Sequence, residues 1–221
     1  MPARASTSGA PPQSAQTTPS AAAPPSSLFK EDSLSSSSSP SDAYERLRLK
    51  AWGASRRFKA LFKAEVSPKV GAIGRGYVSV WWDGATETLT WRASAPIAGN
   101  GKGGALRKGK RGGDSPLPGN LDPTDLIACI LGTPAAAPSS SLPFEETPRG
   151  FRVRIDDPNR TALVDALGRV VEMRFPKSEV VAFQPGEGVP RRIEANGPDG
   201  RAVLTLEAYS SWVESEEVPP L

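Results

Sequence analysis

Between residues 41 and 213, two pairs of adjacent carboxylates have the type and spacing that could support general acid–base chemistry. Asp156 and Asp157 stand directly before Pro158, a context that favours a turn at the end of a strand. Glu145 and Glu146 are predicted to form an exposed acidic pair. Paired carboxylates suffice for some hydrolytic mechanisms. Because both contexts favour surface positions, we expect neither pair to be catalytic.

Other catalytic groups are scarce. The sequence has no histidine and a single cysteine, Cys129, which excludes Ser-His-Asp and Cys-His arrangements and argues against a zinc site. No glycine motif lies between a strand and a helix, as phosphate-binding loops require. We therefore expect no catalytic residue, no metal and no cofactor, and we predict that the protein is not an enzyme.

A basic segment is the remaining polar feature. Residues 100–113 are rich in Gly, Lys and Arg, with the cations concentrated between Lys102 and Arg111. Such a run could bind the phosphates of nucleic acid or of anionic lipids. No aromatic residue is interleaved for base stacking and no nucleic-acid fold accompanies it, which argues against nucleic acid as a partner. We predict a mobile basic loop, with residues 105–107 as a short strand fragment.

Composition divides the chain into three parts. Residues 1–40 are mostly Ser, Pro, Ala and Thr and cannot bury enough apolar surface to fold, so they are predicted to be a disordered tail or tether. Residues 41–213 suit one domain, and residues 214–221 form a C-terminal tail. No segment approaches the ~18 apolar residues of a membrane-spanning helix. As written, the sequence predicts a soluble protein without an export signal.

Alternating side chains predict three strands between residues 57 and 94. Phe58, Ala60, Phe62, Ala64 and Val66 alternate with more polar residues, the period expected of a half-buried strand. A second strand covers residues 77–82, and Asp83-Gly84 is predicted as a two-residue hairpin turn. A third covers residues 85–94 and runs into a proline-broken turn at residues 95–99. Adjacent Trp81 and Trp82 must point to opposite faces.

Two helices accompany the strands. Asp42 and Glu45 are predicted as the capping pair of a helix that starts at Ser41 and ends at Gly53. Asp122 is the predicted N-cap of a second helix through residue 131, ended by Gly132. This helix is apolar nearly all round, so it must be buried or must cover something apolar.

A second run of short strands follows a connection at residues 133–149. They are predicted at residues 151–155, 161–164, 169–175, 178–183, 190–195 and 201–209. Regularly spaced short strands are typical of an all-β barrel or sandwich. A curved sheet covered by helices either packs solid or holds a hydrophobic guest, and the residues leave both alternatives open.

The order of several short motifs resembles the LolA/LolB family of bacterial lipoprotein carriers and receptors, and LolB more closely. The motifs are Trp81-Trp82-Asp83-Gly84, Leu89-Thr90-Trp91, Pro96-Ile97-Ala98-Gly99, Ile130-Leu131-Gly132-Thr133-Pro134 and the strand pair at residues 190–212. The resemblance covers about residues 42–213. It implies a mainly β fold with a few helices, an unclosed antiparallel β-barrel with a helical lid over a hydrophobic cavity.

The resemblance also implies a binding site. The cavity would be lined by Phe58, Phe62, Val78, Val80, Trp82, Leu89, Trp91, Leu204 and Leu206. The lid would include Leu126, Ile127 and Ile130. Ile97, on the proline turn, matches the exposed aliphatic residue that is important for transfer to membranes in the receptor.

The implied function is non-catalytic binding of lipoprotein acyl chains, or of another lipid, for lipoprotein localisation at the outer membrane. The expected partners are the acyl chains, the outer-membrane surface and a periplasmic lipoprotein carrier, and the protein is expected to be a monomer at the periplasmic face of that membrane. The alternative is an interaction domain with a solid core, whose basic loop contacts an acidic partner.

Overall fold

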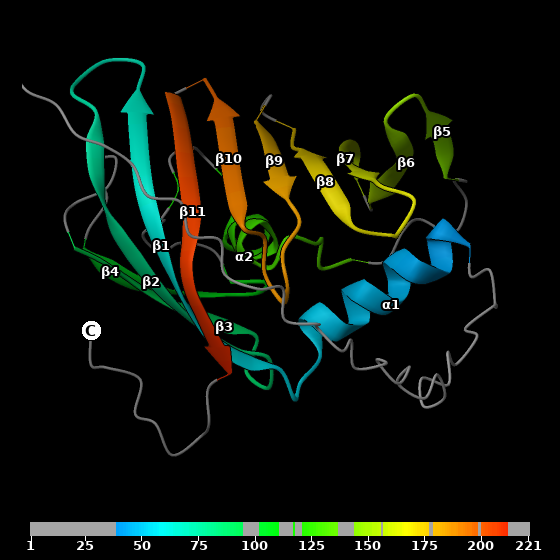
Figure 1. Ribbon diagram of the computed structural model, residues 1–221, viewed down its shortest axis with the longest axis horizontal. Coiled ribbons are helices and arrows are strands. Elements are labelled where there is room, and N and C mark those ends of the chain that lie inside the picture. Colours follow the sequence, from blue (N-terminus) through cyan, green and yellow to red (C-terminus); the bar gives the residue numbers. More distant parts are fainter. Residues whose placement is uncertain are drawn as a thin grey trace, which may run out of the picture. The chain divides into compact units, whose positions relative to one another are not determined.

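Eleven antiparallel strands in one sheet, with two helices, account for the regular structure of the described residues (Figure 1). The computed structural model describes residues 39–94, 102–110, 117, 121–136, 144–155, 157–176, 179–198 and 200–211, with the backbone alone for residues 157–159. The described residues lie within the unit Ser38–Leu221. The predicted mainly β fold with an unclosed antiparallel sheet is therefore confirmed.

The helices and strands have the following bounds. They are α1 (Pro40–Trp52), β1 (Arg57–Pro68), β2 (Gly74–Asp83), β3 (Thr88–Ala93), β4 (Gly103–Arg107), α2 (Pro123–Leu131), β5 (Glu145–Thr147), β6 (Gly150–Ile155), β7 (Asp157–Val164), β8 (Val170–Arg174), β9 (Val180–Gln184), β10 (Arg192–Gly197) and β11 (Gly200–Ser211). No helix in this part of the chain is long and apolar enough to cross a membrane.

The sheet consists of two meanders joined through the first and last strands. The strand order is β4-β3-β2-β1-β11-β10-β9-β8-β7-β6-β5, so only β1 and β11 are neighbours that do not follow one another in the chain. β4 and β5 lie at opposite edges. The connection between them, which contains α2, must therefore pass from one edge of the sheet to the other.

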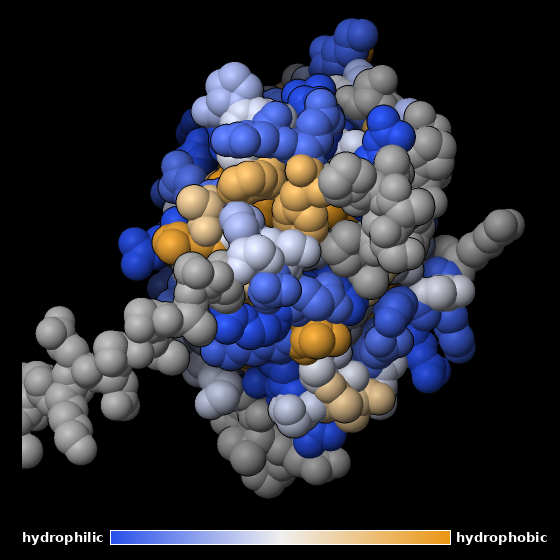
Figure 2. Space-filling model, turned by 90° about the vertical axis from the view of Figure 1, so that its right-hand side faces the viewer, coloured by the Kyte–Doolittle hydropathy of each residue, from blue (hydrophilic) through white to orange (hydrophobic). Residues whose placement is uncertain are grey.

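One face of the sheet and α2 form the hydrophobic core. The predicted alternation of β1 is confirmed, since Phe58, Phe62 and Val66 are buried while Lys63 and Glu65 are exposed. Eight of the nine residues of α2 are buried, and six of them belong to the same core. Figure 1 shows α2 end-on against the middle of the sheet. On the side that carries β5–β8, hydrophilic side chains surround a smaller hydrophobic patch (Figure 2), as expected where one sheet face is solvated.

Both helices begin at capping residues. The N-cap of α1 is Ser39 rather than Ser41, and Asp42 closes the capping box with it, so the predicted Asp42–Glu45 pair is wrong. Asp122 caps α2 by accepting a hydrogen bond from the backbone N–H of Asp125, and Gly132 ends this helix in the left-handed conformation. The second helix therefore has the predicted bounds.

Several local expectations need correction. A four-residue turn at residues 84–87, rather than a two-residue turn, connects β2 to β3, and β3 starts at Thr88. β5 lies within the stretch predicted to be a connection. Asp157 begins β7 instead of ending a strand at a turn. In the basic segment, the strand fragment predicted at residues 105–107 is confirmed as part of the longer edge strand β4.

A bulge interrupts the alternation of inner and outer side chains along β11. Leu206 pairs with Phe62 but Ala208 pairs with Leu61, so the two residues lie on opposite faces of the sheet. Beyond the bulge, Tyr209 takes the inner side and its ring lies 5.5 Å from that of Phe58.

Helix α1 spans the two halves of the sheet. Near its start Tyr44 contacts Phe144 at 6.0 Å between ring centroids, and at its end Trp52 contacts Trp82 at 5.5 Å. The turn between β7 and β8 touches its first turns, because a Cβ on Gly168 would lie 2.4 Å from the Tyr44 backbone nitrogen. The close approach requires glycine at this position.

We expect Gly168→Ala to lower the free energy of unfolding by about 3 kcal/mol, measured by chemical denaturation, because the methyl group overlaps the α1 backbone and φ is +79°. Gly109→Ala is the matched control. Its φ of +72° imposes similar strain, but nothing lies within 4 Å of the added Cβ, so about 1 kcal/mol is expected. Equal losses in the two variants would contradict the α1 contact.

Candidate functional site

The residues predicted to line a cavity share one face of the sheet. Phe58, Phe62, Val78, Val80, Trp82, Leu89, Trp91 and Leu204 are fully buried, and Leu206 is half-buried. They pack in one core with the predicted lid residues Leu126, Ile127 and Ile130. None of these twelve residues lines either hollow described below, and their role in binding stays a prediction. Ile97 lies outside the described residues.

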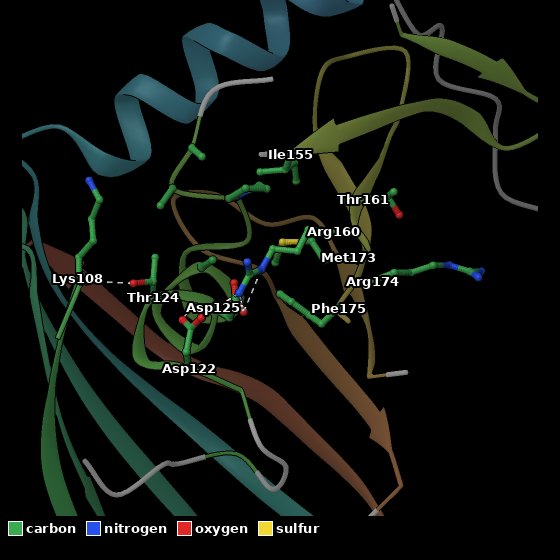
Figure 3. Close-up of a pocket in the computed structure, with 15 residues that line it drawn as sticks. Lys108, Asp122, Thr124, Asp125, Ile155, Arg160, Thr161, Met173, Arg174 and Phe175 are labelled. Atoms are coloured by element: carbon green, nitrogen blue, oxygen red, sulfur yellow. Dashed lines mark hydrogen bonds and ion pairs between the residues drawn. The ribbon is translucent and has the colours of Figure 1, made fainter. Parts of the chain in front are cut away.

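A hollow of about 430 Å³ lies between α2, the segment that follows it, and strands β7 and β8 (Figure 3). Its apolar wall comes from Ala128, Pro134, Ala135, Ala136, Ile155, Met173 and Phe175. Its polar side comes from Lys108, Gly109, Asp122, Thr124, Asp125, Arg160, Thr161 and Arg174. This volume and this mixture are typical of small-molecule sites, which are mostly apolar with a few polar groups that orient the ligand.

Small residues after α2 leave this space open. Gly132 turns the chain out of the helix, and residues 134–136 carry only a proline ring and two methyl side chains. The Arg48 guanidinium of α1 donates a 2.8 Å hydrogen bond to the carbonyl oxygen of Ala135 and holds this segment in place. The wall opposite is built by larger side chains of β8, among them Met173.

Arg160 of β7 binds the first turn of α2. Its Nη2 donates hydrogen bonds to Asp122 Oδ2 and Asp125 Oδ2, each 2.8 Å long, and Figure 3 shows the three side chains converging. Both carboxylates lie at the N-terminal end of α2, whose exposed backbone N–H groups attract negative charge. Helix α2 is thus attached to β7 by charge-assisted hydrogen bonds at the side of the hollow.

Burial changes the protonation of Asp125, one of the two carboxylates that Arg160 contacts. It raises the pKa of Asp125 to about 6, against the opposing effect of the Arg160 hydrogen bond, and the nearby Asp122 charge adds to the increase. Asp125 is therefore charged at neutral pH and gains a proton under mildly acidic conditions.

Lys108 lies at the β4 side of the same hollow. Its Nζ is 2.6 Å from Glu87 Oε1 and 5.4 Å from the centroid of the Trp52 ring. The next residue, Gly109, donates its backbone N–H to Thr124 Oγ1 at 3.1 Å. Part of the basic segment is thus attached to α2, which composition alone did not indicate.

A second hollow, of about 440 Å³, lies at the C-terminal end of α2. It is bordered by Leu47, Lys50 and Ala51 of α1, by residues 185–190, and by Tyr209. Loops form more of its wall than in the first hollow. We therefore take the hollow between α2 and β7–β8, whose walls are mostly regular elements, as the candidate site.

Sequence reasoning missed the residues of this site. Asp122 was assigned only as a helix cap, and Arg160, Met173 and Phe175 carried no signal, because antiparallel pairing and the crossing of α2 bring them together. Glu145 and Glu146 are exposed, as predicted. Cys129 is buried, and burial raises the pKa of its thiol, which disfavours the reactive thiolate. No group of three metal-ligating side chains occurs within the described part of the chain.

Comparison with solved structures finds a similar fold in a protein of known structure. A LolA superfamily protein from Nitrosomonas europaea is similar with a TM-score of 0.52 at 12% identity, over 80% of this chain and 94% of that chain. No family model matches the sequence. No curated protein matches it either. The chain therefore has a LolA-like fold, while the closer likeness to LolB stays a prediction.

Two further structures match with TM-scores below 0.5. An outer membrane lipoprotein-sorting domain from Vibrio parahaemolyticus has a TM-score of 0.45 at 10% identity, over 79% of this chain and 93% of that chain. A DUF1329 family protein from Desulfovibrio piger has a TM-score of 0.40 at 12% identity, over 81% and 96% of the two chains.

The raised pKa of Asp125 predicts a pH dependence of stability. Between the ordinary Asp pKa of ~3.9 and the folded-state value of about 6, the folded protein holds a proton that the unfolded chain has lost. We expect this group to lower the free energy of unfolding by about 2 kcal/mol as pH rises from ~4 through ~6. The Asp125→Asn variant should lack this part of the decrease in denaturation curves measured across that range.

The control for this experiment is Glu194→Gln. Arg201, 2.8 Å from Glu194, holds the pKa of that carboxyl below its ordinary value, so this variant should keep the decrease. An unchanged decrease in Asp125→Asn would show that Asp125 does not titrate in this range.

Proposed function

We propose that the hollow between α2 and β7–β8 binds the hydrocarbon chain of an amphiphile and performs no covalent chemistry on it. The observation that carries this proposal is the apolar wall of a 430 Å³ space with charged groups along one side. A hydrocarbon chain placed there would leave water at about 25 cal/mol per Å² of buried apolar surface. The LolA-like fold supports the same assignment.

The charged side chains would orient such a ligand. Lys108, Arg160 and Arg174 border the hollow. Each is paired with a carboxylate, since Lys108 contacts Glu87, Arg174 contacts Glu172, and Arg160 contacts Asp122 and Asp125. The polar side therefore offers hydrogen-bond donors and acceptors to a head group and does not select one sign of charge.

A finer assignment follows from the sequence resemblance. We propose that the natural ligands are lipoprotein acyl chains, and that the protein takes part in lipoprotein localisation at the periplasmic face of the outer membrane as a monomer that receives its cargo from a periplasmic carrier. Ile97 is retained in this proposal as the residue that contacts the membrane during transfer.

Movement of α2 would enlarge the site. The nine sheet residues predicted to line a cavity pack in one core with this helix, and longer chains would reach them if α2 moved away from the sheet. The buried indole N–H of Trp82 supports an enlarged site that reaches the sheet. It has no hydrogen-bond partner among the described residues, and a ligand carbonyl could accept a hydrogen bond from it.

The proposal is tested by filling the hollow. We expect Ala135→Trp to weaken binding of dansyl-undecanoic acid at least tenfold, measured by fluorescence and by displacement with palmitate, because the indole occupies the apolar space. The hydrogen bond from Arg48 goes to the Ala135 backbone and survives the change. Ala105→Trp, at an exposed position of β4, is the control and should bind as the wild type does. Equal binding by all three proteins would exclude this hollow as the site.

A second candidate function is that of an interaction domain. It is favoured by the dense packing of the predicted cavity face and by the exposure of Lys102, Arg107 and Lys110 around β4. In this case the basic segment contacts an acidic partner and the folded protein binds no fatty-acid probe, so the same titration separates the two functions.

A further inference from the structure

The turn between β1 and β2 exposes an unusual set of apolar side chains. Val70 is 89% exposed, Ile73 is 58% exposed, and Tyr77 of β2 is 48% exposed. Single exposed aliphatic residues are common on proteins, but three large ones within eight positions of one hairpin form a local apolar tip. We call residues 69–73 together with Tyr77 the hairpin tip. It lies at the upper left of Figure 1.

The base of this hairpin is firmly held. Val66 pairs with Gly74 in β2, and on the other side β1 continues its pairing with β11 as far as Pro68 and Gly200. The β10–β11 turn packs closely here, because a Cβ on Gly200 would lie 2.5 Å from the Ser67 carbonyl oxygen. Val70 and Ile73 therefore extend beyond the paired ends of β1 and β2, where little apolar surface lies near enough to bury them.

Cations surround the tip on its solvent side. Lys69 adjoins Val70 and is exposed, Arg75 follows Ile73, and Lys63 is the register partner of Tyr77 on β1. Between Lys63 and Tyr77, Glu65 is the one carboxylate, and Arg75 lies 3.2 Å from it. Lys63, Lys69 and Arg75 against this single carboxylate give the end of the hairpin a net positive charge next to its aliphatic residues.

We infer that the hairpin tip docks on an anionic phospholipid surface. The tip combines the three kinds of side chain that bind a bilayer interface, namely aliphatic residues for the acyl chains, a tyrosine for the interfacial region and flanking cations for the anionic head groups. An acidic protein would match the cations but has no general need for Val70 and Ile73. A second copy of the chain would bring like charges together.

This docking site is separate from the proposed ligand site. The tip belongs to β1 and β2, whereas the hollow is formed by α2, its following segment and strands β7 and β8. Substitutions at the tip should therefore leave binding of dansyl-undecanoic acid unchanged, and failure of either proposal leaves the other standing.

The test is co-sedimentation of the full chain with vesicles. Wild-type protein should bind vesicles of mixed phosphatidylcholine and phosphatidylglycerol, bind phosphatidylcholine alone more weakly, and lose affinity as salt is raised. The V70S/I73S double variant should bind the anionic vesicles about tenfold or more weakly, because two aliphatic side chains no longer enter the bilayer. Lys63→Gln with Lys69→Gln should reduce the preference for phosphatidylglycerol.

Leu167→Ser is the matched control, since Leu167 is 64% exposed on the β7–β8 turn, away from the hairpin. It should bind vesicles as the wild type does, with circular dichroism confirming that all variants are folded. The inference is overturned if the V70S/I73S variant binds like the wild type, if Leu167→Ser loses as much affinity, or if the tip captures polyglutamate but no vesicles.

Discussion

The pairing of β1 with β11 is the interaction on which the rest of the structure depends. It joins the first strand to the last across 11 register pairs, from Phe58 and Ser211 to Pro68 and Gly200. Every other pair in the sheet connects strands that follow one another in the chain. Without this contact the β1–β4 and β5–β11 meanders would have separate edges and no shared core face.

This arrangement explains where the candidate site lies. Because β4 and β5 end at opposite edges, the chain between them crosses the inner face and places α2 there as a buried, apolar helix. Nine helical residues rise only about 14 Å, too short to cover such a wide sheet. The space left beside α2, toward β7 and β8, is the hollow, and Arg160 attaches the first turn of the helix at its border.

Much of the fold could be predicted from the sequence, because the patterns that define its strands and helices are local. Alternation separated the two faces of β1, and Asp122 with Gly132 marked both ends of α2. What failed depended on distant parts of the chain or on small backbone irregularities. The bulge opposite Leu61 places Ala208 on the outer face, and no periodic pattern in the sequence indicates this shift.

Most of the candidate site could not be predicted from the sequence for the same reason. Asp122 and Arg160 are 38 positions apart and come together only when α2 crosses the sheet. Methyl groups at Ala135 and Ala136 are informative only once the larger side chains opposite them are known. Exposed aliphatic residues such as Val70 were equally unrecognisable, because exposure is a property of the folded sheet.

Pairing the first strand with the last in the middle of the sheet also governs the order in which the molecule can assemble. A ribosome releases β1 long before β11, so one hydrogen-bonding edge of β1 stays unsatisfied until β11 has been synthesised. Closure over so long a separation is entropically slow. The shared sheet therefore forms late, and the early meander is exposed to aggregation and to chaperones in the interval.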